Sequence, residues 1–377
     1  MPRLIQGQQA KKLAILLALF FTILVLIVLN TDILSAETSV SGTISSNTTW
    51  GTANSPYIVT GNVTVASGVT LTIEQGTSVK FNSGTELVIN GALVARGTAT
   101  STITFTSSAA SPAAGDWSYI QFTDSSTDAT FDGNGDYSSG SILEHCIIEY
   151  GGGSSVGGSV EADQALPFIN YCTIRHSASK GISYLNGSLK VHNSTISQNS
   201  GNGIAISENV NSPTTPTYSV SLVNNTVTEN SYTGISIYKV EGQTGNVTID
   251  NNTVTGNGGN GIYATLYPSG DLTITNSTIN SNGEAGIYIG HAAFTVTNNE
   301  ITSNERGITV VNGSGSPNVI SGNTIAYNDS RSADWLSNFG NGYGGLFISY
   351  AHSRSWGPSL VLYVKRSRPH WSSLKVR

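Results

Sequence analysis

The side chains best suited to chemistry in this 377-residue sequence are Glu149, Asp163, Arg175 and His176. Carboxylates close to an arginine and an imidazole could act as acid, base and charge partner in the cleavage of a polysaccharide. Glu149 and Arg175 each follow an isoleucine of a pattern that recurs along the chain, so we expect them to be neighbours in space. A catalytic or binding site is one interpretation of this group, and surface charge pairing is the other.

The distribution of the other acidic residues favours surface pairing. Glycoside hydrolases hold two carboxylates within about 10 Å of each other. The acidic residues of 166–325 fall instead at unrelated positions of the repeat described below, as solvated groups do. They are Glu208, Glu229, Glu241, Asp250, Asp271, Glu284, Glu300 and Glu305.

A short polar segment could bind calcium. Asp132, Asn134 and Asp136 alternate with glycines, as oxygen ligands do at the start of a calcium-binding loop. Tyr137 replaces the glycine that such a loop needs for its turn, and Leu143 stands where the bidentate glutamate should be. The segment therefore predicts either a calcium site or a plain Gly/Asp turn, and no other cofactor is expected.

Two tyrosines could form a surface for sugars. Tyr263 and Tyr288 each end a Gly-Ile-Tyr segment and stand 25 residues apart by subtraction. If they lie on the outward face of neighbouring strands, their rings could bind sugar rings. Exposed tyrosine is also common in β-strands, so an ordinary surface position is the alternative.

The elements that position all these groups belong to a repeat. An apolar residue is followed three positions later by a small residue, and two positions after that by Ile or Val. The intervals between successive final residues are 26, 22, 31, 27, 25, 22 and 24 by subtraction, and such a period indicates a solenoid. These anchors are Ile148, Ile174, Ile196, Val227, Val254, Ile279, Ile301 and Ile325.

Further columns of the repeat define the shape of one coil. The apolar column from Leu143 to Ile320 should point inward, and the small residues two before each anchor should form a polar ladder. An asparagine column that starts at Asn199 suits sharp corners, because Asn tolerates the left-handed backbone conformation. Glycine–isoleucine pairs that end at Ile308 predict another bend. Strands this short can bury their inward face only against the next coil, so the sequence predicts an all-β parallel β-helix.

The most regular repeats also carry a family resemblance. Segments 193–199, 251–257 and 276–282 have the pattern Asn-Asn/Ser-Thr-Ile/Val, a variable pair, then Asn. This pattern resembles the repeat of right-handed parallel β-helix proteins of the pectin-lyase-like superfamily, and the short strands of 63–106 look like the opening rungs of exported bacterial and archaeal surface proteins. The resemblance implies a link to glycans. Pectate lyases, pectin lyases and polygalacturonases share the fold, but the fold alone does not carry their activity.

The cysteines and histidines show no metal-ligand spacing. Cys146 and Cys172 occupy the same position of adjacent coils, which places their Cα atoms about 4.8 Å apart. Parallel side chains leave the Cβ atoms slightly too distant for a relaxed disulfide, so two buried thiols are favoured over a bond, although export would permit one. His145, His192 and His291 are each expected to be isolated imidazoles.

The N-terminus carries a hydrophobic leader. Three basic residues precede an uncharged apolar run from Leu13 to Leu29, a pattern that predicts entry into the secretory pathway. Residues 1–36 are therefore a signal peptide or, if they are not removed, an N-terminal membrane anchor. We expect a secreted or cell-surface protein whose membrane contact, if any, is limited to this segment.

The remainder divides into three parts. Residues 37–140 should form the N-terminal cap and opening rungs, and 141–350 the repeats of the β-helix. The segment 351–377 is an atypical tail that holds six Lys and Arg and no Asp or Glu. It matches neither a rung nor an amphipathic helix, and a truncation or frame-shift would explain it.

Composition limits the function classes. Only 11% of the residues are charged, the net charge is −6, and no basic stripe lies among aromatic residues, so nucleic acid is not an expected partner. We expect a monomer that acts as a structural or carbohydrate-binding module, with a polysaccharide or cell-surface glycan as partner. A polysaccharide lyase or glycoside hydrolase that uses Glu149, Asp163, Arg175 and His176 is one alternative, and an adhesin fragment is another.

Overall fold

The computed structural model describes residues 11–22, 37–153, 157–207, 218–239, 245–266, 271–311, 318–326, 328, 346–349 and 360–362. They belong to two compact units, Met1–Glu37 and Thr38–Arg377. In the first unit, residues 11–22 form a helix. Among the described residues, none of the helices combines the length and the apolar content that crossing a bilayer requires. Residues 1–10 and 23–36 of the predicted leader lie outside the described part of the chain.

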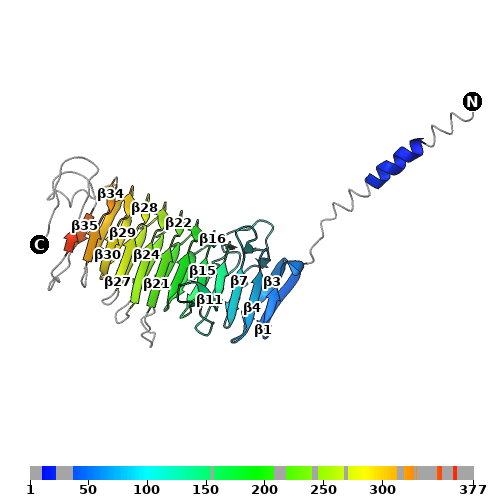
Figure 1. Cartoon of the computed structure of the whole chain (residues 1–377), viewed down its shortest axis with the longest axis horizontal. Coiled ribbons are helices and arrows are strands. Elements are labelled where there is room, and N and C mark those ends of the chain that lie inside the picture. The colour runs from blue at the N-terminus through cyan, green and yellow to red at the C-terminus, as the bar shows by residue number, and fades with distance from the viewer. Residues whose placement is uncertain are drawn as a thin grey trace, which may run out of the picture. The chain divides into compact units, whose positions relative to one another are not determined.

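The second unit is a coil of short parallel strands stacked side by side (Figure 1). Each full turn contributes one strand to each of three stacks, which we name face 1, face 2 and face 3. Face 1 contains β5 (Ser78–Phe81), β8 (Ile103–Ser107), β13 (Cys146–Glu149), β16 (Thr173–Arg175), β19 (Thr195–Ser197), β22 (Thr226–Thr228), β25 (Thr253–Thr255), β28 (Thr278–Asn280), β31 (Glu300–Thr302) and β34 (Thr324–Ala326). Face 2 contains β6 (Leu87–Ile89), β9 (Ile120–Phe122), β14 (Gly158–Asp163), β17 (Lys180–Leu185), β20 (Ile204–Ser207), β23 (Ile235–Lys239), β26 (Ile262–Leu266), β29 (Ala285–Gly290), β32 (Arg306–Val311) and β35 (Leu346–Ser349).

Face 3 is a separate sheet. It contains β2 (Thr48–Trp50), β4 (Thr70–Glu74), β7 (Ala92–Arg96), β12 (Ile142–Glu144), β15 (Phe168–Asn170), β18 (Leu189–His192), β21 (Tyr218–Val223), β24 (Gly245–Asp250), β27 (Asp271–Thr275), β30 (Ala293–Thr297), β33 (Asn318–Ser321) and β36 (Leu360–Leu362). At the N-terminal end, β1 (Thr38–Ile44) pairs with β3 (Tyr57–Val65), and β3 pairs with both β5 and β6, so it opens faces 1 and 2 together. A 3-10 turn, η1 (Thr52–Asn54), lies between β2 and β3.

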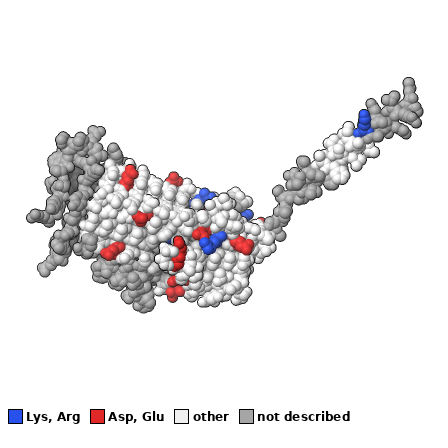
Figure 2. Space-filling model, in the orientation of Figure 1, with Lys and Arg blue, Asp and Glu red and all other residues white. Residues whose placement is uncertain are grey.

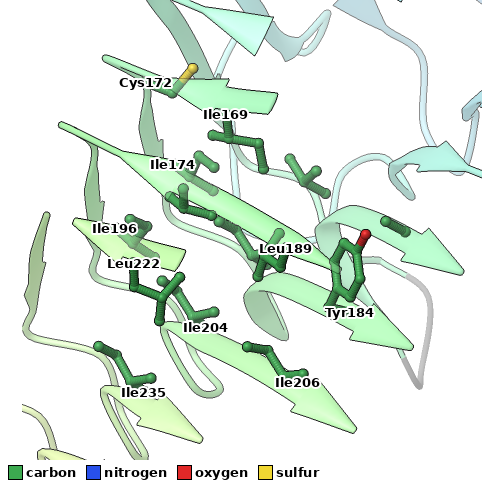
Figure 3. Close-up of a cluster of buried hydrophobic side chains, with 14 of the residues drawn as sticks. Ile169, Cys172, Ile174, Tyr184, Leu189, Ile196, Ile204, Ile206, Leu222 and Ile235 are labelled. Atoms are coloured by element: carbon green, nitrogen blue, oxygen red, sulfur yellow. The ribbon is translucent and has the colours of Figure 1, made fainter. Parts of the chain in front are cut away.

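The strand register confirms the predicted inward columns. On face 1 the eight anchors pair in one unbroken series from Ile148 to Ile325. The column from Leu143 to Ile320 does the same on face 3. These side chains interdigitate in a dry interior (Figure 3), where burial of each isoleucine contributes about 1.5–3 kcal/mol. No single coil could bury them alone, so neighbouring rungs stabilise one another.

Two buried ladders flank face 1 and confirm the predicted polar stacking. Asn257 is typical: its Oδ1 accepts from the backbone N of Asn230 at 3.1 Å, and its Nδ2 donates to Oδ1 of Asn282 at 3.0 Å. The predicted left-handed conformation of this column is wrong, because the residues with positive φ stand one position earlier, such as Glu229 at 56°. The ladder asparagines instead satisfy buried backbone groups at the corner.

The glycines before the second apolar column provide space on face 2 rather than a special backbone angle. A Cβ on Gly261 would lie 2.7 Å from the carbonyl oxygen of Gly286 on the next rung and 2.7 Å from Cγ2 of Ile279. No side chain fits there without displacing the neighbouring coil. The predicted bend is present at Gly203, Gly234 and Gly261, and the close approach of successive coils is the reason that glycine stands there.

A hairpin covers part of the outer surface of face 3. Strands β10 (Thr130–Phe131) and β11 (Tyr137–Ser139) form it, within the polar excursion that follows β9. Ala129 and Phe131 pack against Ile142 and Phe168 in a small second core outside the coil. Toward the C-terminus, β36 pairs with β33, so the stack extends into the segment 351–377, where the sequence showed no rung.

Candidate functional site

The structure brings Glu149 and Arg175 together, as their places in the repeat predict. They are partners in register on β13 and β16. Nε and Nη2 of Arg175 donate to Oε2 of Glu149 at 2.9 and 2.7 Å, and the Thr106 hydroxyl donates to Oε1 at 3.1 Å. The glutamate side chain is 13% exposed and the arginine side chain 40% exposed. Both carboxylate oxygens therefore accept a hydrogen bond, while part of the arginine side chain is open to solvent.

Aromatic rings stand at both ends of this pair of strands. At the start, His145 stacks on Tyr171 with ring centroids 4.7 Å apart and planes within 7°. At the other end, Tyr150 stacks on His176 with centroids 5.3 Å apart. His145 is therefore not an isolated imidazole, as the sequence had suggested. The signal was available, because His145 and Tyr171 stand one position before Cys146 and Cys172.

All four of these corner residues have left-handed backbones, with φ between 49° and 63°. Later rungs use Asn at the first corner, including Asn193 and Asn224. A bulky residue in this conformation is unfavourable relative to Asn or Gly. The rungs of β13 and β16 thus depart from the repeat at the first corner, whereas the second corner holds a different residue type on each later rung, such as Gln198 and Glu229.

Asp163 lies apart from this group. It ends β14 on face 2, where it pairs in register with Leu185 and accepts a hydrogen bond from Nδ2 of Asn186 at 3.4 Å. Within the described residues, no contact links Asp163 to Glu149 or Arg175. The four candidate catalytic residues therefore do not form one cluster.

The predicted calcium segment forms the turn of the β10–β11 hairpin. Oδ1 of Asp132 accepts from the backbone N of Asn134 at 2.9 Å and of Asp136 at 3.0 Å. In the ranges that the structure describes, no group of three or more His, Cys, Asp or Glu residues is arranged to hold a metal ion. Calcium binding stays a prediction for this segment.

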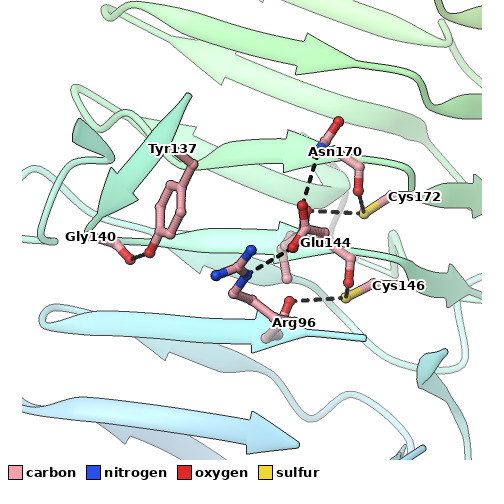
Figure 4. A network of polar contacts seen from close by, with 9 residues as sticks. Arg96, Tyr137, Gly140, Glu144, Cys146, Asn170 and Cys172 are labelled. Atoms are coloured by element: carbon pink, nitrogen blue, oxygen red, sulfur yellow. Dashed lines mark hydrogen bonds and ion pairs between the residues drawn. The ribbon is translucent and has the colours of Figure 1, made fainter. Parts of the chain in front are cut away.

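A polar network crosses face 3 beside the hairpin (Figure 4). Glu144 accepts from Nε of Arg96 at 2.8 Å and from Nδ2 of Asn170 at 3.0 Å. Cys146 and Cys172 lie beside it, at the corner between face 3 and face 1, and both are buried and free. The thiol of Cys172 donates to the carbonyl of Leu143 at 3.3 Å, and burial raises the pKa of the Cys146 thiol well above its usual value. Two buried thiols are the arrangement that the sequence favoured.

The hairpin also lies over Lys190, which sequence reasoning missed, and His192, which is not the isolated imidazole that the sequence had suggested, because its Nε2 lies 2.9 Å from the hydroxyl of Ser221. Nζ of Lys190 lies 3.6 Å from the centre of the Phe131 ring and 3.4 Å from the carbonyl of Gly135. His192 packs edge-on against Phe168. Burial, with a smaller effect of Lys190, lowers the pKa of His192 to about 4, so this imidazole is neutral at physiological pH.

A second missed group lies on face 2. Burial raises the pKa of the Glu161 carboxyl, whose Oε2 accepts from Nε2 of Gln121 at 3.3 Å. Burial and a hydrogen bond to Glu86 raise the pKa of Tyr119 to about 12. The sequence did not indicate that these residues lie close together, because the rungs that hold them differ in length and their spacing along the chain is therefore irregular.

The two candidate tyrosines are stacked on face 2. Tyr263 and Tyr288 are partners in register on β26 and β29, with ring centroids 4.8 Å apart and planes within 12°. Tyr238, which is 44% exposed, lies on the preceding strand β23, where Ser236 is the direct neighbour of Tyr263. The rings cover each other's inner faces, so the open face of Tyr263 is the one above the small Ser236.

Comparison with known families agrees with this architecture. The family described as right handed beta helix region matches residues 33–269, 167–325 and 242–353. The chain belongs to this right-handed β-helix family. Comparison with curated proteins gives no match.

Two solved structures are similar to this β-helix. A crystal structure of the periplasmic alginate epimerase AlgG has a TM-score of 0.40 and 13% sequence identity over 81% of this chain and 83% of that one. The Dettilon tailspike protein has a TM-score of 0.34 and 15% identity over 83% of this chain and 62% of that one. Neither supports a functional assignment at this level of similarity.

Charge is sparse on the β-helix. Figure 2 shows few acidic and basic side chains on the visible face, with a large uncharged surface around them. The ion pairs among the described residues are Arg96–Glu144, Arg175–Glu149 and Arg306–Glu305. A ligand for such a surface would be held mainly by hydroxyl groups and aromatic rings rather than by net charge.

Proposed function

We propose that this protein is an exported cell-surface β-helix that acts as a structural or carbohydrate-binding module. The observation that carries the binding role is the stacked pair Tyr263–Tyr288 on the outer surface of face 2. Tyrosine rings offer an apolar face to the C–H groups of a sugar and a hydroxyl to its oxygens. The open face of the Tyr263 ring lies above Ser236 of strand β23, which also carries Tyr238. One sugar ring could bind there.

The rival proposal, a lyase or hydrolase, has weaker support from the geometry. A general base or nucleophile needs a carboxylate that can reach the substrate. Both oxygens of Glu149 are occupied by Arg175 and Thr106, and Asp163 lies on another face. A binding or structural role requires no such free carboxylate.

A glycan array and a depolymerisation screen on the purified protein, each with and without calcium, test the proposal. Binding without cleavage that is lost in Tyr263→Ala/Tyr288→Ala supports the carbohydrate-binding module. Tyr232→Ala is a matched control, because Tyr232 is exposed but lies outside the stack. New reducing or unsaturated ends would favour the enzyme, and a calcium requirement would support the predicted calcium segment. Absence of both binding and cleavage would leave only a structural or adhesive role.

Export is part of the same proposal, and it is supported by the apolar leader. Mass spectrometry of the protein recovered from its native cells would distinguish cleavage near residue 36 from a retained anchor. Recovery of the uncleaved chain in the soluble cell interior would contradict export.

A further inference from the structure

We infer that the rung of β16 provides a second glycan-binding site, formed by Tyr171, Arg175 and His176, that receives a neutral sugar chain. This inference rests on the proposed carbohydrate-binding role and adds a site on a different face of the coil. The three residues lie on one rung, with Arg175 on the strand and the two rings at its ends.

The side chains become smaller at the next rung. β19 lies directly beside β16, and Thr195 and Ser197 there are the register partners of Thr173 and Arg175. Gln198 at the far corner donates to Oε2 of Glu229 at 2.9 Å and so extends away from His176. At the rung spacing of about 4.8 Å, the ring of Tyr171 lies beside the shorter side chain of Asn193, whose Nδ2 donates to Oδ1 of Asn170 at 2.9 Å. His176 lies beside Gln198, and Thr195 and Ser197 lie between these two corners.

Stacking determines which ring faces a ligand could use. His145 covers one face of Tyr171, and Tyr150 covers one face of His176. The opposite faces are directed toward the rung of β19. Tyr171 is 50% exposed, which shows that its ring is not used to fill the interior. The two rings are five residues apart, at most about 17 Å along an extended chain, so one short oligosaccharide could contact both.

The polar groups between the rings of Tyr171 and His176 suit a neutral ligand. Arg175 uses Nε and Nη2 to bind Glu149, and its side chain as a whole is 40% exposed. Its remaining N–H groups can donate to sugar hydroxyls. Because the carboxylate compensates the guanidinium charge at 2.7 Å, an acidic sugar would gain little electrostatic attraction. Thr195 and Ser197 add hydroxyl groups on the neighbouring strand β19.

The backbone gives an independent reason to assign the ring of Tyr171 a function. Tyr171 occupies a left-handed corner at φ 53°, where the next two rungs have Asn193 and Asn224. Asn is the favourable residue in this conformation, so folding alone does not call for tyrosine here. At the other corner, His176 stands where the next rung has Gln198.

The repeat therefore supplies its own test variant. Tyr171→Asn/His176→Gln restores the residues of the next rung and is expected to fold normally, with a melting temperature within a few degrees of the wild type. We would titrate the full-length protein with cello-, malto- and mannooligosaccharides and, for comparison, oligogalacturonides. Loss of two ring contacts is expected to weaken binding of the neutral ligand about tenfold. Tyr232→Asn, at an exposed position away from the stacks, is expected to leave it unchanged.

The outcomes separate this inference from the proposed function. If Tyr263→Ala/Tyr288→Ala loses binding and Tyr171→Asn/His176→Gln does not, the second site is refuted and the first is retained. A wild type that binds none of these sugars refutes both. Binding of oligogalacturonides alone would refute the assignment of a neutral ligand. A tenfold loss in the Tyr171→Asn/His176→Gln variant, with normal folding, supports the site.

Discussion

Removal of one ladder side chain, in Asn257→Ala, should destabilise the coil strongly. Oδ1 of Asn257 accepts from the backbone N of Asn230 at 3.1 Å and from its Nδ2 at 2.9 Å. Nδ2 of Asn257 donates to the carbonyl of Val227 at 3.1 Å and to Oδ1 of Asn282 at 3.0 Å. Asn257 is only 1% exposed, so water does not replace these bonds.

The magnitude follows from the groups left without a partner. Alanine removes the acceptor for the Asn230 N–H and one donor to the Val227 carbonyl, both of which are backbone groups at a buried corner. A buried polar group without a hydrogen bond costs about 1–3 kcal/mol. We therefore expect the free energy of unfolding to fall by about 4 kcal/mol.

Urea denaturation followed by circular dichroism measures this change. The matched control is Asn251→Gly on the same rung, whose exposed side chain donates only to Oδ1 of Asn224 at 2.8 Å. Glycine keeps the left-handed backbone there, so the control should lose about 1 kcal/mol or less. If Asn257→Ala is no more destabilised than Asn251→Gly, the ladder does not stabilise the corner in the way argued.

Three further predictions concern single sites. Because burial lowers the pKa of His192 to about 4, the unfolded chain binds a proton first as pH falls from about 6.5 to 4, and stability is lost in that window. Urea denaturation at pH 7 and at pH 4.5 measures how much unfolding free energy is lost, and in His192→Val this loss should be smaller than in the wild type by about 2 kcal/mol, a value discounted for partial exposure. An equal loss in the two proteins would contradict the argument. Cys146 and Cys172 should react with a thiol reagent only after unfolding, as mass spectrometry can show, and labelling of the folded protein would contradict their burial. Gly261→Ala should lower the unfolding free energy by about 2 kcal/mol, because its Cβ would lie 2.7 Å from a carbonyl oxygen. Gly133→Ala is the control and should leave the unfolding free energy unchanged, because its Cβ would meet no atom within 4 Å. Equal effects of the two substitutions would refute the argument from close spacing.

The candidate site was only partly predictable. The pairing of Glu149 with Arg175 followed from their equivalent places after Ile148 and Ile174, and the structure confirms it. The separation of Asp163 from Glu149 and Arg175 could not be predicted, because the segment that joins β13 on face 1 to β14 on face 2 is longer than the corresponding segment of the next rungs. The sequence showed that His145 aligns with Tyr171 and Tyr150 with His176 in the repeat. It did not show that their rings stack, because stacking depends on the left-handed backbone that turns these side chains outward.

Similar reasoning explains the hairpin beside face 3. Its turn residues were recognisable in the sequence as a Gly/Asp segment. Its packing on Ile142 and Phe168 was not, because residues that face outward on a rung normally meet solvent. The low pKa of His192 results from this cover, so no local pattern could have indicated it.

By itself, the sequence determined the period, the inward columns and the ladders of this protein, because each depends on alternation and spacing that every rung repeats. The tertiary structure decided what the irregular rungs do. There the chain leaves the repeat, and contacts between distant residues depend on how each longer segment folds back onto the coil. The two proposed glycan sites differ in the same way: the first follows from aligned tyrosines, and the second follows from the backbone at the corners of β16.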